Sequence, residues 1–471
     1  MWSAAGIDED VVAHQRSGMS SMPQSTDHGP GLPLDAGVAG VELEPVYRRI
    51  ALRIMPFLIL LFVVAWLDRV NVGFAKLGML SDLGFSEAVY GFGAGIFFLG
   101  YLLFEIPSNL LFEKIGARKT FARIALLWGF TSIAMMFVKT AGMFYLLRVL
   151  LGAFEAGLYP GVILYLTYWF PARHRGRMVG WFMIAGPVSG ILGGPISGLI
   201  MAATGSAGGL ANWQWLFFLE GLPSVALGLL TLLIVDDTPA QAKWLSDRER
   251  AFVLDDLSRE RHDAGARMHS FAGALRLPRV WLLTIVYFCL VSANPTLAFW
   301  GPSIINGLGV SNNLAIGLLS AVPYIAAVMA TILVGRQSDR TLERRWHTAL
   351  SCFAAGVGLV MMGIFASNPP LAFGALVLAQ AAALAAFAPF WQMPTLLLAG
   401  TAAAGSIALI NSIGNLSGWL GPFMVGWLKD LTGRTSTGLY VVAGLELAAA
   451  ILIVRFMPRA PVGPTPARVT R

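Results

Sequence analysis

The sequence predicts an all-α membrane protein, in which twelve membrane-spanning helices form two bundles of six. Three observations carry this prediction: an apolar composition, regularly repeated apolar runs, and one charged segment between the sixth and seventh run. Of the 471 residues, 56% are hydrophobic and 13% are charged, whereas about 25% of the residues of a soluble domain are charged. Such a chain cannot cover its surface with polar groups, so we expect it to lie in a lipid bilayer.

Apolar runs of the length needed to cross a bilayer as helices recur along the chain. They fall at residues 54–79, 87–112, 120–138, 141–168, 178–203, 212–235, 278–305, 313–335, 347–366, 370–399, 403–428 and 437–457. The predicted organisation is a disordered cytoplasmic tail (1–45), a six-helix bundle (46–235), a charged cytoplasmic linker (236–276), a second six-helix bundle (277–458) and a cytoplasmic tail (459–471). The first tail lacks the apolar core of a signal peptide.

The distribution of Lys and Arg predicts the orientation, because short loops rich in these residues stay in the cytoplasm. One set of loops carries most of them, including the linker and Lys114, Arg118, Lys119, Arg123, Arg173, Arg175, Arg177, Arg336, Arg340, Arg344 and Arg345. The opposite loops carry only Lys76, Lys139, Lys429 and Arg434. We therefore expect both termini in the cytoplasm. The same distribution accounts for the net charge of +7, so nucleic acid is not an expected partner.

Enzymatic and metal chemistry find little support in the sequence. Cys289 and Cys352 both lie inside apolar runs, and the histidines form no H-x-x-x-H pair. No nucleophile–base pair, metal cluster or phosphate-binding loop is visible. We expect neither an enzyme nor a bound cofactor.

Ionisable residues inside the apolar runs are the strongest functional signal, because a charge at mid-bilayer is costly unless it faces a partner or a water-filled cavity. Asp68 and Arg69 lie about 14 residues into the first run, roughly 20 Å from its start at 1.5 Å per residue. Glu155 lies at a similar depth in the fourth run, and Arg148 lies two turns away on the same helix face. Small residues in the stretch 148–161 favour close approach of another helix.

Two interpretations of these charges are open. The residues can neutralise each other between helices, Asp68 with Arg148 and Arg69 with Glu155. Alternatively, they line a solute cavity, in which an arginine binds a carboxylate and the acids exchange protons. The cavity is the favoured interpretation, because buried ion pairs carry a desolvation cost that apolar packing would avoid.

Two further polar positions have weaker signals. Glu105 lies nearer the cytoplasmic end of the second run and precedes Pro107, so we expect a gate or a structural contact. Asn294 precedes Pro295 in the seventh run. A helix break there would free backbone carbonyls near mid-bilayer, which favours a binding role for Asn294.

The loop motifs of the chain resemble those of the major facilitator superfamily. NLLFEKIGARK (109–119) is similar to its cytoplasmic signature between helices 2 and 3, although Asn109 replaces a Gly and Glu113 replaces the usual Asp. GRQSDRTLERR (335–345) is a weaker echo in the second half, as expected for two repeats that face a central cavity. The resemblance implies a conformational role for Glu113, Gly116, Arg118, Asp339 and Arg340.

Motifs within the spans resemble the anion:cation symporter family, whose members carry sugar acids, tartrate, phthalates, sialate or glutamate. They are DRVNVGFA (68–75), RVLLGAFEA (148–156), FWGPSII (299–305), FWQMPT (390–395) and INSIGNLSGWLGP (410–422). The resemblance covers about residues 45–458. It implies proton binding by Asp68 and Glu155, carboxylate binding by Arg69, and a role for Arg148 as the partner of the acids. It also implies cavity contacts for Tyr101, Trp391 and Asn411.

The sequence departs from the sugar-acid carriers at two places. Trp66 stands where those members often have Tyr, and the glycine-rich stretch 186–198 stands where some place a Gln. We therefore expect a small carboxylate whose identity the sequence leaves open.

The predicted function is proton-coupled uptake of a small organic anion by alternating access, in a monomer in a bacterial inner membrane. The proton is the expected coupling ion. Export or exchange of an anion is the alternative, as is drug/proton antiport, whose helix 5 motif resembles the spacing of Gly186, Gly190, Gly194 and Gly198. A transport-like sensor is a third possibility, which the short linker disfavours.

Overall fold

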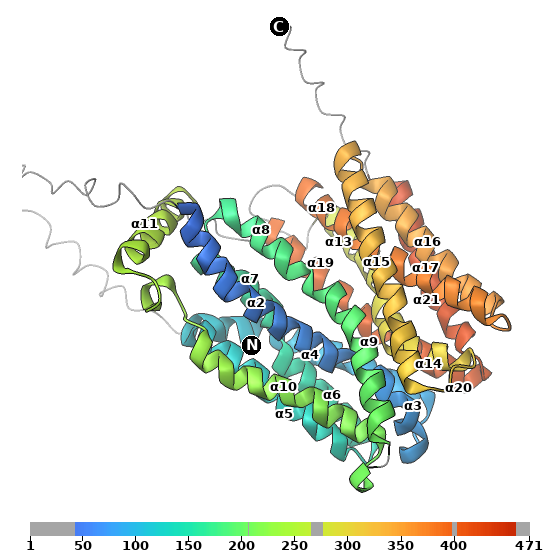
Figure 1. Cartoon of the computed structure of the whole chain (residues 1–471). Coiled ribbons are helices and arrows are strands. Elements are labelled where there is room, and N and C mark those ends of the chain that lie inside the picture. The colour runs from blue at the N-terminus through green and yellow to red at the C-terminus, as the bar shows by residue number, and fades with distance from the viewer. Residues whose placement is uncertain (1–42, 206, 265–276, 398–402, 458–471) are drawn as a thin grey trace, which may run out of the picture. The chain divides into compact units, whose positions relative to one another are not determined.

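The computed structural model describes residues 43–205, 207–264, 277–397 and 403–457, and helices account for nearly all of them (Figure 1). The long helices are α2 (Leu43–Val70), α3 (Val72–Leu83), α4 (Glu87–Ile115), α5 (Ala117–Ala134), α6 (Ala141–Glu155), α7 (Leu158–Trp169), α8 (Ala172–Met183), α9 (Ala185–Thr204), α10 (Asn212–Ile234), α11 (Asp247–Ala264), α13 (Pro278–Val291), α14 (Ala293–Gly307), α15 (Asn313–Thr341), α16 (Arg345–Ile364), α17 (Pro369–Ala385), α18 (Phe387–Leu397), α19 (Ala403–Asn415), α20 (Ser417–Thr432) and α21 (Thr435–Phe456). Short 3-10 turns are η2 (Met135–Phe137), η3 (Ala207–Gly209) and η4 (Pro239–Gln241).

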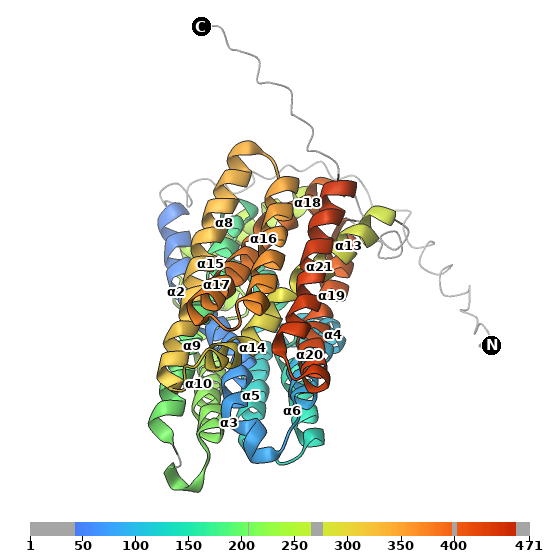
Figure 2. The ribbon, with the colours of Figure 1, turned by 90° about the vertical axis from the view of Figure 1, so that its right-hand side faces the viewer.

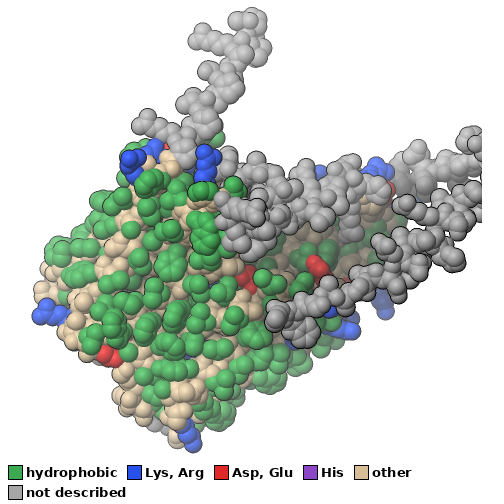
Figure 3. All heavy atoms as spheres, turned by 180° about the vertical axis from the view of Figure 1, so that it is seen from behind, with side chains coloured by type: hydrophobic (Ala, Val, Ile, Leu, Met, Phe, Trp, Pro, Cys, Tyr) green, Lys and Arg blue, Asp and Glu red, His purple; other side chains and the backbone are tan. Residues whose placement is uncertain are grey.

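Eleven helical segments of the described chain are long and apolar enough to cross a membrane. Each corresponds to one of the predicted apolar runs. The remaining predicted run, 403–428, is present as the two shorter helices α19 and α20, so the count of twelve spans stays a prediction. Figure 3 shows apolar side chains over most of one face, with Lys and Arg mainly near its margins, as expected for a surface that meets lipid.

Several predicted spans are broken near their middle. The breaks lie between α2 and α3, α6 and α7, α8 and α9, α13 and α14, α17 and α18, and α19 and α20. The fourth span breaks directly after Glu155, where Gly157 adopts a φ of 90° that favours glycine. The seventh span breaks at Ser292, two residues before the predicted position at Asn294. Broken helices leave backbone carbonyls without helical partners, and such backbone inside a membrane lies against protein or a cavity.

Helices before the linker contact helices after it along what we call the seam, formed by α3, α4 and α9 on one side and α14, α15 and α20 on the other (Figures 1 and 2). Glycines allow the backbones to touch there. A Cβ atom on Gly91 would lie 2.5 Å from the Pro422 carbonyl oxygen, and one on Gly194 would lie 2.5 Å from that of Gly317. These positions lie in the helix halves predicted to face outside.

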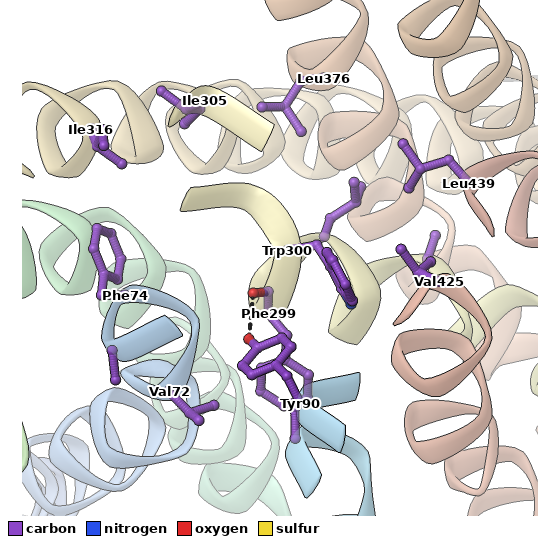
Figure 4. Packing of buried hydrophobic residues seen from close by; sticks show 14 of the residues in the cluster. Val72, Phe74, Tyr90, Phe299, Trp300, Ile305, Ile316, Leu376, Val425 and Leu439 are labelled. Carbon is purple, nitrogen blue, oxygen red and sulfur yellow. Dashed lines mark hydrogen bonds between the residues drawn. The ribbon is translucent and has the colours of Figure 1, made fainter. Parts of the chain in front are cut away.

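Polar contacts close the seam at the same end. The Lys76 ammonium lies 2.7 Å from the Glu87 carboxylate, which also pairs with Lys429. The Asp430 carboxylate accepts hydrogen bonds from the backbone N–H groups of Glu87 (3.1 Å) and Ala88 (2.8 Å), where the positive end of the α4 dipole favours an acid. Figure 4 shows the buried contact below them, in which the Tyr90 hydroxyl donates to the Phe299 carbonyl oxygen (2.7 Å).

The described part of the predicted linker packs against the helices before it. Asp256 of α11 accepts hydrogen bonds from the Tyr47 hydroxyl (2.6 Å) and from both terminal nitrogens of Arg173 (2.6 and 3.0 Å). Trp244 stacks on Trp169 with ring centroids 5.8 Å apart. Burial alone would raise the pKa of Asp256, but the hydrogen bonds from Arg173 and Tyr47 hold it below its usual value. The rest of the linker lies outside the described residues. So do the residues of the first predicted tail up to Glu42 and the residues beyond Met457.

Candidate functional site

The centre of the site is an ion pair between Arg69, one residue from the end of α2, and Glu155, the last residue of α6. The Arg69 side chain is 14% exposed and that of Glu155 is 2% exposed. This is one of the two pairings considered from the sequence. The pair combines a fixed positive charge with an acid that protonation would neutralise, so the charge available to an anion depends on the state of Glu155.

Aromatic rings surround the Arg69 guanidinium. Its Cζ atom lies 4.9 Å from the centroid of the Phe97 ring, 5.1 Å from Trp66 and 5.6 Å from Tyr101. Rings at these distances attract the cation through their π faces. Among the described residues the Trp66 Nε1–H has no hydrogen-bond partner although it is buried. Tyr101 and Trp66 thus both lie beside Arg69, while the predicted role of Tyr101 as a cavity residue stays a prediction.

Arg148 is fully buried but pairs with neither predicted acid. Its guanidinium donates hydrogen bonds to the carbonyl oxygens of Ala94 (2.7 Å), Gly93 (3.2 Å) and Arg69 (3.4 Å). The break after α2 leaves carbonyls such as that of Arg69 available for this contact. Arg148 therefore connects α6 with α2 and α4 and supports the backbone that carries Arg69. The predicted pairing of Arg148 with Asp68 is wrong for this structure.

Asp68 lies on a different side of α2 from Arg69, because consecutive helical residues point about 100° apart. It is buried and accepts hydrogen bonds from Trp128 Nε1 (2.7 Å) and Ser132 Oγ (2.7 Å) of α5, and from Ser224 of α10. These donors come from helices away from the seam. Asp68 is therefore not a direct partner of Arg69, whereas Glu155 is.

A cavity lies between helices on both sides of the seam, and neither Arg69 nor Glu155 is among its lining residues. Val70, which follows Arg69, is one of its lining residues, and the others come from both sides of the seam. The wall is mainly apolar and includes Phe74, Leu297, Pro302 and Leu376, while its polar groups are Ser189, Ser320, Tyr324 and Gln380. A small organic molecule with few polar groups fits such a lining.

The predicted binding residues after the linker lie in polar or aromatic pairs of their own. Asn294 accepts a hydrogen bond from Gln380 Nε2 (2.9 Å), and Gln380 lines the cavity. Asn411 accepts from Asn415 Nδ2 (3.2 Å). The Trp391 ring packs edge-on against Tyr287 at 4.8 Å. Asn294 is thereby connected to the cavity, while Trp391 and Asn411 have no direct contact with Arg69 in the described structure.

The predicted conformational residues lie at helix ends. Gly116 ends α4 with a φ of 84°, and the Asp237 carboxylate next to it accepts a hydrogen bond from the Arg118 backbone N–H (2.8 Å). The contact with Asp237 was not predicted. Glu113 is exposed on the last turns of α4, and Glu105 is half-buried one turn after Tyr101.

In the second half, α15 continues to Thr341, so Asp339 and Arg340 lie on a helix and not in the predicted turn. Asp339 pairs with Arg344 at 2.7 Å.

Two buried acids were not predicted as site residues. Glu220 of α10 is 5% exposed and Glu446 of α21 is fully buried. Each is the one acid in its apolar run, at 212–235 and 437–457. A lone acid in an apolar run is the sequence signal by which either residue could have been predicted.

The fold and the site define a membrane transporter, with broken spans, a cavity lined from both sides of the seam, and a buried ion pair. Residues 58–422 match the Major Facilitator Superfamily, and the chain belongs to that family.

It is 48% identical over 419 residues to a protein of Agrobacterium vitis named "Putative tartrate transporter", covering 88% of this chain and 95% of the relative. It is 40% identical to a "Quinolone resistance transporter" of Acinetobacter baumannii, covering 87% and 94%. The inward-open xylose transporter XylE from E. coli has the same fold, with a TM-score of 0.71, 14% identity, and 88% and 98% coverage. The chain is thus a transporter and not an enzyme.

Proposed function

We propose that this transporter carries a small organic anion, a carboxylate such as tartrate, a sugar acid, or an aromatic or dicarboxylic acid, into the cell together with protons. The single observation that carries the proposal is the buried Arg69–Glu155 ion pair between two membrane-spanning segments. Arg69 offers a planar fork that matches a carboxylate, and Glu155 competes with the substrate for it. The relative named for tartrate supports this substrate class.

In the proposed cycle, Glu155 takes up a proton from outside and releases Arg69, which then binds the substrate anion. With the charge compensated, the two halves rearrange about the site. Loss of the proton inside restores the Arg69–Glu155 pair and displaces the anion. The polar contacts of Lys76, Glu87, Lys429 and Asp430 hold the seam, and we assign this structure to a state closed towards the outside.

We further propose twelve spans in a bacterial inner membrane, with α19 and α20 forming the eleventh and both termini in the cytoplasm. The distribution of Lys and Arg between the loops supports this orientation. The expected transporter is a monomer with the proton as its coupling ion and no further cofactor.

The test is the variant Arg69→Ala in proteoliposomes with an acidic exterior and labelled tartrate, sugar acids or aromatic acids as probes. Uptake of the transported anion is expected to fall at least about 30-fold, since a buried charge contact is worth roughly 2 kcal/mol or more. Arg69→Lys keeps the charge but loses the fork, so it should retain part of the uptake. Wild-type uptake by Arg69→Ala would show that the anion binds elsewhere.

Export is the second candidate function, and the similarity to a transporter named for quinolone resistance favours it. Import and export differ in the effect of an imposed pH gradient on net flux. An acidic exterior drives accumulation by a proton symporter and drives depletion by a proton antiporter. Counterflow without a gradient measures exchange alone.

A further inference from the structure

Glu220 lies in the interior of α10, away from the Arg69–Glu155 pair, and its carboxyl group has an incomplete set of partners. Ser197 Oγ of α9 donates a hydrogen bond to Glu220 Oε1 at 2.7 Å. The other carboxyl oxygen, Oε2, is buried and has no hydrogen-bond partner among the described residues. A charged carboxylate in such a place is strongly disfavoured unless a cation or several donors compensate it.

Asp68 belongs to the same buried group of side chains. Ser224, one turn after Glu220 on α10, donates a hydrogen bond to Asp68. Ser224 and Glu220 lie on the same face of α10, so the helix face that contacts Asp68 also carries Glu220. Asn71, one turn after Asp68, is fully buried beside Glu220. We call Asp68, Asn71, Ser132, Ser197, Glu220 and Ser224 the acid cluster.

No cation from the described helices packed against α10 pairs with Glu220. Those elements are α2, α3, α5, α9 and η2. On α2, Arg69 pairs with Glu155, and on α3, Lys76 pairs with Glu87. Asp82 of α3 accepts a hydrogen bond from Trp213 at the first turn of α10.

The basic residues of α5 lie in its first two turns, where Arg123 donates to Ser108. The helices α9 and η2 carry no charged residue.

Two carboxyl groups of one buried cluster, with hydroxyl and indole donors but no cation, cannot both carry charge at a modest free-energy cost. The acid cluster therefore differs in kind from the Arg69–Glu155 pair. An ion pair in a bundle can serve packing alone, whereas two acids in one buried cluster require a proton to be stable. That requirement links the contact between α2 and α10 to proton binding.

We propose that Glu220 is a further proton-binding acid of this transporter, in the same cluster as Asp68, for which the family resemblance already implies proton binding. The inference rests on the proton coupling in the proposed function and adds a second coupling acid to it. Proton binding converts one carboxylate to the neutral acid, and the proton leaves by the reverse step. Glu155 controls how tightly the anion is held, and the acid cluster controls the packing of α10 against α2.

The first test needs no substrate. Infrared difference spectra between acidic and basic pH are recorded for the purified transporter in lipid. The wild type is expected to show a protonated-carboxyl C=O band that Glu220→Gln lacks and Glu220→Asp retains. Ser197→Ala removes only the donor to Glu220 and should shift this band. Glu446→Gln, an equally buried acid in the second half, should leave it in place. A Glu220→Gln spectrum identical to that of the wild type would overturn the proposal, as would an unshifted band in Ser197→Ala.

The second test separates this proposal from the proposed function, with tartrate as the probe in proteoliposomes. Each pH unit across the membrane supports about ten-fold accumulation per coupled proton, or 1.36 kcal/mol. Glu220→Gln is expected to lose about ten-fold of this accumulation for each pH unit, yet to keep the wild-type pH dependence of tartrate binding. Undiminished accumulation in this variant refutes the role of Glu220 while the proposed function stands. If an imposed pH gradient drives no accumulation of the anion by the wild type, the proton coupling in the proposed function is refuted. The infrared band then still decides whether Glu220 binds a proton.

Discussion

The predicted binding residues before the linker and those after it make contrasting polar contacts. Before the linker, the polar groups are charged: Arg69 pairs with Glu155, and Arg148 binds three backbone carbonyls. After it, they are amides, with Gln380 donating to Asn294 and Asn415 donating to Asn411. No described ion pair crosses the seam at the level of Arg69; those that do cross it lie at one end, around Glu87.

This difference affects how the two halves can move relative to each other. Separating a buried ion pair leaves charge without compensation, at a cost of several kcal/mol. With Arg69 and Glu155 on one side, the two halves can move apart without breaking that pair. Under the proposed function, the charged half determines whether an anion and a proton bind, and the amide half determines which molecule fits. The first two predictions below each test one side of that division, and the third tests the linker helix.

The largest expected effect is that of Glu155→Gln. The amide resembles the protonated acid, so Arg69 stays available to an anion at every pH. Accumulation driven by a pH gradient is expected to vanish, a loss of about ten-fold per pH unit, while exchange of labelled for unlabelled substrate continues. Counterflow and gradient-driven uptake in the same vesicles measure both. If a pH gradient still drives accumulation, Glu155 is not a coupling residue, and the charged half does not control proton binding through it.

A smaller effect is expected for Gln380→Ala in the amide half. The variant removes a cavity group and leaves Asn294 without its donor, a change worth roughly 1 kcal/mol, or about five-fold in KM. The dependence of uptake on the pH gradient should stay that of the wild type. Kinetics for several carboxylates would show whether the ranking of substrates changes. A variant with normal KM values but altered pH dependence would contradict the division of roles.

The smallest effect concerns the linker helix. The lowered pKa of Asp256 means that its ionised form is favoured in the folded state. The ionised Asp256 carboxylate contributes fully to the free energy of unfolding above the unfolded-state pKa, about 4. This contribution is lost as the pH falls through the lower folded-state pKa. Asp256→Asn is expected to lower the melting temperature by about 1–2 °C at pH 7, because exposed ion pairs stabilise weakly. The difference from wild type should shrink towards pH 3 in a thermal-shift series. An equal difference at both pH values would mean that charge on Asp256 is irrelevant.

The sequence was sufficient for the fold class and for part of the site. Apolar runs and buried charges are local properties, so the spans could be predicted from them, and the Arg69–Glu155 pairing was one of two interpretations that the sequence left open. The direction of Asp68 could not, because it depends on how α2 is rotated against α5 and α10, which only packing determines. Glu220 was overlooked although it is the one acid in its apolar run, and its placement in a cluster with Asp68 depends on how α10 packs against α2. The break after Glu155 was hidden because a single glycine in an apolar run is common in membrane helices.

The seam has a consequence for how often the molecule can cycle. Where Gly91 meets the Pro422 carbonyl and Gly194 meets that of Gly317, the touching atoms are backbone. Side chains that lock into each other must lose rotamer freedom each time they meet, at a cost of up to about 2 kcal/mol for the longest ones. Glycine has no side-chain rotamers, so closing the seam at these positions costs little side-chain entropy. Opening it again requires no rearrangement of side chains. Such an interface suits a transporter, which must repeat the same conformational change once for every molecule that it carries.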